Sequence, residues 1–174
     1  LEGAGVEMIA VYTPEQARDL IEATIGVPIL LLLPIRSFAR DDRLYRAVSR
    51  GQLHLTVHDA ANLEALVDIA DGLGMPLSVH LELDTGMSRG GVSIVDGDGP
   101  SGGLLARINE HPRLRLAGVY THFASADCDE ALTRVQNDRF EAWLERHADA
   151  IPTDCIIHSA NTFGALRSRD YHRR

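Results

Sequence analysis

Side chains able to do chemistry gather in three short stretches, each of which follows an apolar run. Arg89 lies in a glycine-rich segment after one such run, and His122 closes the next. His158 ends a third run and is followed closely by Asn161 and Thr162. A permanent cation, imidazoles, an amide and a hydroxyl are groups that bind anions and move protons. We therefore take these three stretches as the candidate functional site.

Two carboxylates precede the first stretch. In a strand over residues 77–84, Glu82 and Asp84 share one face with His80, while leucines take the other face. A carboxylate buried on that face needs a cation or several hydrogen-bond donors, and Arg89 in the following loop is the natural partner. The alternative is that Glu82 and Asp84 are structural carboxylates that tie down the glycine-rich loop.

The elements that position these residues alternate between short apolar runs and helical segments. Thr13 is expected to be a helix N-cap, with Pro14 at the first helical position and Gln16 completing a capping box. Asp59 is expected to cap a later helix. We predict strands at 8–12, 28–33, 53–57, 77–84, 116–122 and 155–158, and helices at 14–25, 41–50, 60–72, 104–111, 129–147 and 161–167.

Two segments carry more specific expectations. Residues 95–103 contain four glycines and are expected to form a loop. The long helix at 129–147 is expected to place one apolar face against the core. That face consists of Leu132, Val135, Phe140, Trp143 and Leu144.

Six strands in strict alternation with helices predict a parallel α/β fold. A doubly wound sheet needs a glycine-rich phosphate turn after an early strand, but Gly3-Ala4-Gly5 precedes a strand and lacks a third glycine. A (β/α)8 barrel takes about 250 residues, so six units in 174 residues have the density of a barrel with some units missing. We predict an incomplete (β/α)8 TIM-type barrel of about six β/α units, in one domain over residues 1–174.

Composition excludes several classes of function. The formal net charge is -8, which disfavours electrostatic nucleic-acid binding. The longest apolar run, residues 28–35, is far shorter than the roughly 20 residues of a membrane span. All 17 basic residues are arginine, so the chain holds neither a P-loop lysine nor a side-chain amine for a Schiff base. Two cysteines are too few for a disulfide framework, and a reducing cytoplasm is the default expectation.

Other motifs are weaker. The run Leu83-Asp84-Thr85-Gly86 matches a short aspartic-protease signature, which belongs to an all-β fold and needs two such aspartates. Pairs such as His54 with His58, or His122 with Asp127, lack a clear third metal ligand, and we predict no metal. The sequence shows neither a Gly-x-Ser-x-Gly elbow nor a cysteine with an evident base.

Taken together, the three stretches resemble the alanine racemase family. The matching segments are HLELDTGMSRGGV at 80–92, AGVYTHFASAD at 117–127 and HSANT at 158–162, and MIAVYTPEQA at 8–17 resembles the family's second strand and following helix. The resemblance implies a fold-type III pyridoxal 5'-phosphate enzyme on a TIM-type barrel with a separate C-terminal β domain. It further implies a cytoplasmic bacterial homodimer that interconverts L- and D-alanine for the cell wall, by two-base α-proton exchange through an external aldimine.

The resemblance also assigns roles to single residues. Arg89 matches the arginine that contacts the phenolic oxygen of the cofactor and helps to bind the substrate carboxylate. His122 matches the histidine that stacks on the pyridine ring. Thr162 matches a phosphate-binding serine and Asn161 its neighbour at the phosphate. His158 matches a histidine that orients a second arginine on the pyridine nitrogen.

The chain departs from the family pattern at several points. Glu82 stands where many members carry a carbamylated lysine, and we expect its carboxylate to orient Arg89 instead. The Schiff-base lysine, the catalytic tyrosine and the pyridine-nitrogen arginine of the family have no counterpart in this chain. We therefore expect residues 1–174 to be a fragment that covers about strands two to seven and lacks the C-terminal β domain, and that is inactive alone.

Two alternatives remain at this point. The parent could be a broad-specificity or serine racemase, or a D-amino-acid lyase on the same barrel, because substrate choice depends on residues outside this chain. It could also be a non-catalytic protein that binds pyridoxal phosphate in a regulatory role.

Overall fold

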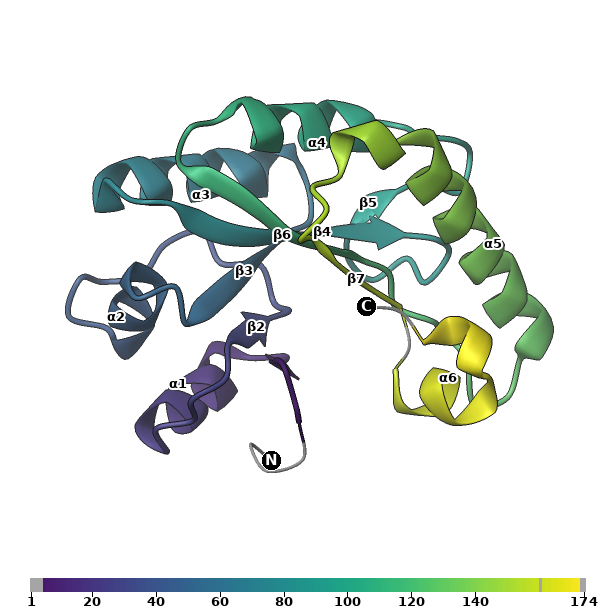
Figure 1. Cartoon of the computed structure of the whole chain (residues 1–174), viewed down its shortest axis with the longest axis horizontal. Coiled ribbons are helices and arrows are strands. Elements are labelled where there is room, and N and C mark those ends of the chain that lie inside the picture. Colours follow the sequence, from purple (N-terminus) through teal and green to yellow (C-terminus); the bar gives the residue numbers. More distant parts are fainter. Residues whose placement is uncertain (1–4, 160, 173–174) are drawn as a thin grey trace. The chain divides into compact units, whose positions relative to one another are not determined.

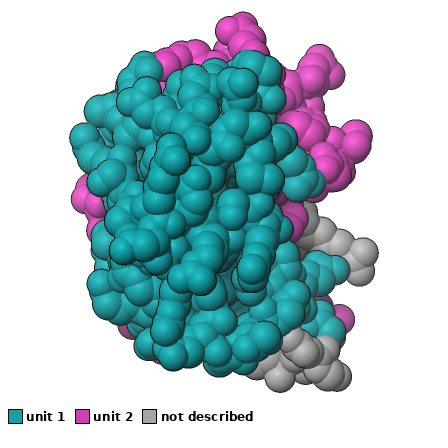
Figure 2. All heavy atoms as spheres, turned by 90° about the vertical axis from the view of Figure 1, so that its left-hand side faces the viewer, with its two compact units in different colours: residues 1–80, 111–115 teal, residues 81–110, 116–174 magenta. Residues whose placement is uncertain are grey.

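The protein was analysed as a computed structural model that describes residues 5–159 and 161–172 (Figure 1). Its chain divides into two compact units, coloured separately in Figure 2. Unit 1 comprises Leu1–His80 and His111–Arg115, and unit 2 comprises Leu81–Glu110 and Leu116–Arg174. Gly3 and Ala4, from the glycine turn considered above, lie outside the described residues.

Strands and helices alternate along the described chain, apart from one short strand that directly follows another (Figure 1). Two short 3-10 helices, η2 (Ala148–Ala150) and η3 (Arg169–Tyr171), complete them. In chain order the others are β1 (Ile9–Val11), α1 (Pro14–Glu22), β2 (Ile29–Leu31), α2 (Arg43–Ser49), β3 (Leu53–Val57), α3 (Ala60–Leu73), β4 (Leu77–Asp84), β5 (Val92–Ser93), α4 (Ser101–Glu110), β6 (Leu114–Tyr120), α5 (Glu130–Arg146), β7 (Ile156–His158) and α6 (Thr162–Arg167).

The strand order confirms the predicted fold class. Among the described residues the sheet runs β1-β2-β3-β4-β6-β7, and β5 pairs with β4. The pairs β1–β2, β2–β3, β4–β5 and β6–β7 are all parallel. A doubly wound sheet reverses its strand order at a switch point, whereas this order follows the chain. The protein thus has the α/β fold of an incomplete (β/α)8 TIM-type barrel.

The core strands of unit 1 are buried along their whole length. Ile29, Leu30 and Leu31 in β2 are completely inaccessible, and every residue of β3 is buried. Because both faces of such strands are covered, β2 is entirely apolar, as expected of a parallel sheet. The polar His54 and Thr56 of β3 are buried with hydrogen-bond partners. Each fully buried leucine or isoleucine contributes about 1.5–3 kcal/mol relative to an exposed one.

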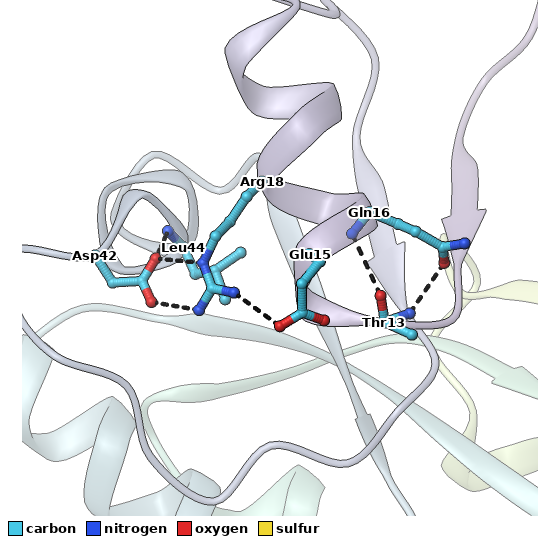
Figure 3. Close-up of polar contacts among 6 residues, drawn as sticks. All are labelled: Thr13, Glu15, Gln16, Arg18, Asp42 and Leu44. Carbon is cyan, nitrogen blue, oxygen red and sulfur yellow. Dashed lines mark hydrogen bonds and ion pairs between the residues drawn. The ribbon is translucent and has the colours of Figure 1, made fainter.

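Helix starts in unit 1 follow the sequence closely (Figure 3). The Thr13 side chain accepts from the Gln16 backbone at 3.3 Å, and the Gln16 side chain accepts from the Thr13 backbone at 3.1 Å, which completes the predicted capping box. Asp42 caps α2 by accepting from the Leu44 backbone at 2.9 Å. Two hydrogen bonds from the Arg18 guanidinium to the same carboxylate, at 3.1 and 2.7 Å, tie α1 to α2.

The loop expected at residues 95–103 is shorter than predicted, because α4 already begins at Ser101. The buried Ser101 hydroxyl donates to the Asp98 carbonyl at 2.5 Å and accepts from the Trp143 indole at 2.6 Å. Gly102 packs so closely on His147 that an added Cβ would lie 3.1 Å from Cε1. These contacts favour a helix at glycines that the local sequence marks as a loop.

The buried face of α5 also differs from the prediction. Phe140 and Trp143 are buried as expected, but Val135 is 45% exposed. The face instead includes two polar residues, Thr133 and Gln136, which are completely buried. Their side chains are hydrogen-bonded, and this offsets the cost of removing them from water. None of the helices in the described part of the chain has the length and apolar character needed to cross a membrane.

Candidate active site

All seven predicted site residues belong to unit 2. Glu82 and Asp84 lie in β4, and Arg89 follows that strand in the loop before β5. His122 follows β6, and His158 is the last residue of β7. The other two, Asn161 and Thr162, begin α6. Carboxyl ends of parallel strands are where barrel enzymes carry their reactive groups.

Asp84 organises the loop that carries Arg89. Its Oδ1 accepts hydrogen bonds from the backbone N–H groups of Gly86, Met87 and Ser88 at 2.9, 2.8 and 3.0 Å. Three donors satisfy most of what a carboxylate loses on leaving water. The contacts of Asp84 therefore match the structural alternative, in which this carboxylate ties down the loop.

Glu82 lies against the far end of the same loop. Its side chain is buried, with 5% exposure, and Gly91 has a φ of +89°. A Cβ at position 91 would lie 2.8 Å from Glu82 Cγ and 2.9 Å from the Glu82 carbonyl oxygen. Only glycine permits both this backbone conformation and this approach. The loop thus leaves β4 at Asp84 and returns to the strand at Glu82.

Arg89 lies near enough to His122 for its charge to act on the imidazole. Burial lowers the pKa of His122, and the positive charge of Arg89 lowers this pKa further. A cation acts on the pKa of a neighbouring imidazole in this way because it disfavours a second positive charge. The His122 ring is therefore neutral near pH 7 and lies within electrostatic reach of the Arg89 guanidinium.

His158 is held neutral by burial alone. Burial lowers the pKa of His158 to about 4. Its ring stacks on Tyr120, with the centroids 4.7 Å apart and an interplanar angle of 11°. Because β6 and β7 pair with Tyr120 opposite His158, the stack fixes the imidazole across adjacent strand ends.

Asn161 links the third stretch to the second. Its Nδ2 donates to the Phe123 carbonyl at 3.1 Å, and its Oδ1 accepts from the Gly164 backbone at 2.9 Å as the N-cap of α6. Thr162, the first residue of that helix, is exposed. Thus the amide of Asn161 holds the backbone, while the Thr162 hydroxyl faces solvent in this chain. Ala160, within the same motif, lies outside the described residues.

One residue that bears on the site escaped the sequence analysis. Gln136 of α5 reaches the ends of both β4 and β6, with hydrogen bonds to Thr85, His122 and Ala124. A signal was present in the sequence, because a glutamine lies one turn before Phe140 and two turns before Trp143. Its polarity excluded it from the face that was predicted from apolar residues alone.

The histidines of unit 1 make other contacts. His54 Nδ1 lies 3.0 Å from His80 Nε2, and His58 Nε2 lies 2.8 Å from the Leu32 carbonyl. Among the described residues there is no group of three or more histidine, cysteine, aspartate or glutamate side chains that could hold a metal ion.

Comparison with known proteins decides the family. The family model described as "Alanine racemase, N-terminal domain" matches residues 1–174. This chain belongs to that family. The alanine racemase of Sorangium cellulosum is 30% identical over 170 residues, which are 96% of this chain and 43% of that protein. Alanine racemase 1 of Oceanobacillus iheyensis is 33% identical over 174 residues, with 97% of this chain and 43% of that protein covered.

Solved alanine racemases share the fold. The Clostridium difficile enzyme superposes with a TM-score of 0.82 at 24% identity, over 99% of this chain and 46% of that one. The biosynthetic enzyme of Pseudomonas aeruginosa gives a TM-score of 0.75 at 28% identity, over 97% and 43% of the two chains. The chain therefore spans less than half the length of the family members that it matches.

Proposed function

We propose that the complete protein is an alanine racemase that interconverts L- and D-alanine with pyridoxal 5'-phosphate. The observation that carries this proposal is that Arg89 and a neutral His122 follow neighbouring strands and lie within electrostatic reach of each other. Both residues lie in the stretches that resemble the family, and the family itself rests on a match over all 174 residues.

The donor set fits the cofactor in its chemistry. Pyridoxal phosphate presents a phenolic oxygen, an aromatic ring and a phosphate. Arg89 supplies a permanent cation with several N–H donors, which suits an anionic oxygen. His122 supplies a flat imidazole whose low pKa keeps it uncharged. Thr162 supplies an exposed hydroxyl, and Asn161 places that hydroxyl by capping α6.

When bound, the cofactor supplies an electron sink for a carbanion at the α-carbon of the amino acid. Arg89 would hold the phenolic oxygen and help to bind the substrate carboxylate, so that the α-proton faces a base. His122 would support the ring without adding a positive charge. His158, neutral and stacked on Tyr120, would accept a hydrogen bond from a second arginine and so orient it.

The residues that move the proton are proposed to lie outside this chain. The sequence holds no lysine, so no side chain in it can form a Schiff base with the cofactor. We propose that a lysine and a tyrosine from other parts of the protein exchange the α-proton, that the complete protein is a cytoplasmic homodimer, and that residues 1–174 alone are inactive.

Support for an alanine substrate comes from relatives. The proteins at 30% and 33% identity are named alanine racemases. The Bacillus anthracis enzyme, 29% identical with a TM-score of 0.72 over 92% of this chain and 39% of that one, was solved with bound L-Ala-P. These relatives thus favour a substrate with a small side chain over one with a larger side chain.

A substrate panel tests the proposal. The complete protein, loaded with pyridoxal phosphate, is given the L-enantiomers of alanine, serine and larger amino acids, and the D-product is measured by chiral chromatography. We expect the highest kcat/KM with alanine. A preference for serine, a broad profile, or release of a keto acid and ammonia would each replace the proposed reaction with another.

A further inference from the structure

Gln136 is a polar side chain in the core of unit 2. Its exposed fraction is 0%, although it lies on the face of α5 that also buries Phe140 and Trp143. An amide in such a place destabilises the fold unless its donors and acceptor find partners. The partners that it finds are not on its own helix but at the ends of two strands.

The hydrogen bonds of Gln136 bracket His122. Nε2 donates to the His122 carbonyl at 3.2 Å, and Oε1 accepts from the Ala124 backbone at 2.9 Å. Nε2 also donates to Thr85 Oγ1 at 3.1 Å, just past the end of β4. Thr85 Oγ1 in turn lies 2.8 Å from Thr121 Oγ1, beside His122. One amide therefore fixes the backbone that follows the imidazole and, through the Thr85 hydroxyl, reaches the Thr121 side chain that precedes it.

The same face of α5 also contacts the first residues of the loop that carries Arg89. Arg139 lies one turn after Gln136, and its Nη1 donates to the Thr85 carbonyl at 2.8 Å. A Cβ at Gly86 would lie 3.2 Å from that nitrogen, and Gly86 has a φ of +136°. Helix α5 thus fixes both the strand end that leads into this loop and the segment that carries His122.

We infer that Gln136 is a positioning residue, whose buried amide sets the place of the His122 ring relative to the loop that carries Arg89. The inference rests on the proposed function, since its importance for catalysis assumes that these two groups contact the cofactor. Gln136 itself acts through the backbone of His122 and Ala124 and through the Thr85 hydroxyl. A displacement of about 1 Å in such a group can reduce a rate about 100-fold.

The test compares Gln136→Met in the complete protein with a matched control. Methionine keeps the volume and removes every hydrogen bond of the amide. Thr133→Val is the control, because Thr133 is equally buried on the same face but its hydroxyl donates at 2.7 Å to the Asp129 carbonyl of its own helix start. Both variants lose a buried hydrogen bond, and only Gln136→Met loses one to the strand ends.

Two readouts are measured. The first is the pKa of His122 from NMR of histidine-labelled protein without cofactor. We expect Gln136→Met to raise it toward the ordinary value near 6.5, because a displaced ring is less buried and farther from Arg89. The second is racemisation by the loaded enzyme, where we expect kcat to fall roughly tenfold to 100-fold with a smaller change in KM. Thr133→Val should leave both at the wild-type values.

Thr85→Val provides a second variant if Gln136→Met does not fold. It is nearly isosteric and removes the hydroxyl that joins Gln136 to Thr121, and we expect the same changes at smaller size. The inference is overturned if the strand-end variants leave the His122 pKa and kcat as Thr133→Val does. If the wild-type enzyme racemises no amino acid while Gln136→Met still shifts the His122 pKa, the proposed function fails and the positioning of His122 by Gln136 stands.

Discussion

At the scale of single residues, the site combines one permanent cation with imidazoles that stay neutral. Burial lowers the pKa of both His122 and His158, and Arg89 adds to the effect at His122. The spacing of these residues after apolar runs was enough to predict that they lie at strand ends. The hydrogen bonds of Gln136 could not be predicted, because they join residues 51 and 14 positions apart in the sequence.

Glu82 offers a prediction at this scale. If its buried carboxylate orients Arg89, Glu82→Gln removes the negative charge with little change in shape. Arg89 then becomes less ordered, so the His122 pKa should rise and the racemase activity of the complete enzyme should fall about tenfold or more. NMR titration and steady-state kinetics check the two effects. Near-normal activity with an unchanged His122 pKa would refute the role.

The buried pair of His54 and His80 predicts a pH dependence of stability. Burial and then the charge of Arg115 lower the pKa of His54 to about 4 in the folded chain, against about 6.5 in the unfolded chain. As the pH falls through this window, the unfolded chain binds a proton first. Stability is therefore full above pH 6.5 and is lost toward pH 4, by on the order of 2 kcal/mol.

Urea unfolding between pH 7.5 and 4.5 measures this loss. In His54→Gln, which keeps a hydrogen-bonding group beside His80, the loss should be clearly smaller. His172→Gln, at an exposed position, controls for the removal of a histidine and should retain the wild-type dependence. Equal pH slopes in all three proteins would show that the His54 ring does not carry the effect.

At the scale of elements, helix caps were the most predictable features. Thr13, Pro14 and Gln16 form the expected capping box, Asp59 caps α3, and β3 and β4 have the predicted bounds. Local chemistry fixes such features. The predicted start of α4 was wrong, and so was the predicted place of Val135 on the buried face of α5, although Phe140 and Trp143 are buried as predicted. Contacts with His147, Trp143 and the strand ends outweigh local preference there.

Asp42 carries two roles at once, which makes its replacement informative. It caps α2 and binds Arg18 of α1, and the Arg18 hydrogen bonds hold the pKa of Asp42 below its usual range. Asp42→Ala should lower the free energy of unfolding by about 1–2 kcal/mol. Glu15→Ala removes only exposed contacts, an ion pair with Arg18 and hydrogen bonds at the start of α1, and should change it by less than about 0.5 kcal/mol. Equal effects of both would contradict the account of α2.

Two neighbouring glycines in α4 form a matched pair for a second test. Nothing lies within 4 Å of a Cβ at Gly103, so Gly103→Ala should stabilise the protein by about 0.5–1 kcal/mol through helix propensity. At Gly102 the same methyl group would press on His147, and the gain should be lost or reversed. Thermal unfolding of Gly102→Ala and Gly103→Ala measures the two changes in stability. A similar gain in stability at both positions would mean that the His147 side chain can move aside without a loss of free energy.

At the scale of the whole molecule, a succession of parallel strands in chain order presents the side chains of one family motif from three strand ends. The sequence predicted this fold class because β/α alternation is periodic and visible. The matched relatives are more than twice as long as this chain, and a lysine-free chain cannot itself supply a covalent anchor for the cofactor. We therefore propose that these residues form the cofactor-binding wall of a racemase.

The most direct test of that claim follows the α-proton. The complete protein, loaded with pyridoxal phosphate, is incubated with L-alanine in deuterium oxide, and the alanine is analysed by proton NMR and chiral chromatography. We predict that D-alanine accumulates toward an equal mixture and carries deuterium at the α-carbon, and that Arg89→Ala slows this strongly. Retention of both the L-configuration and the α-proton, in protein that has bound the cofactor, would contradict the account.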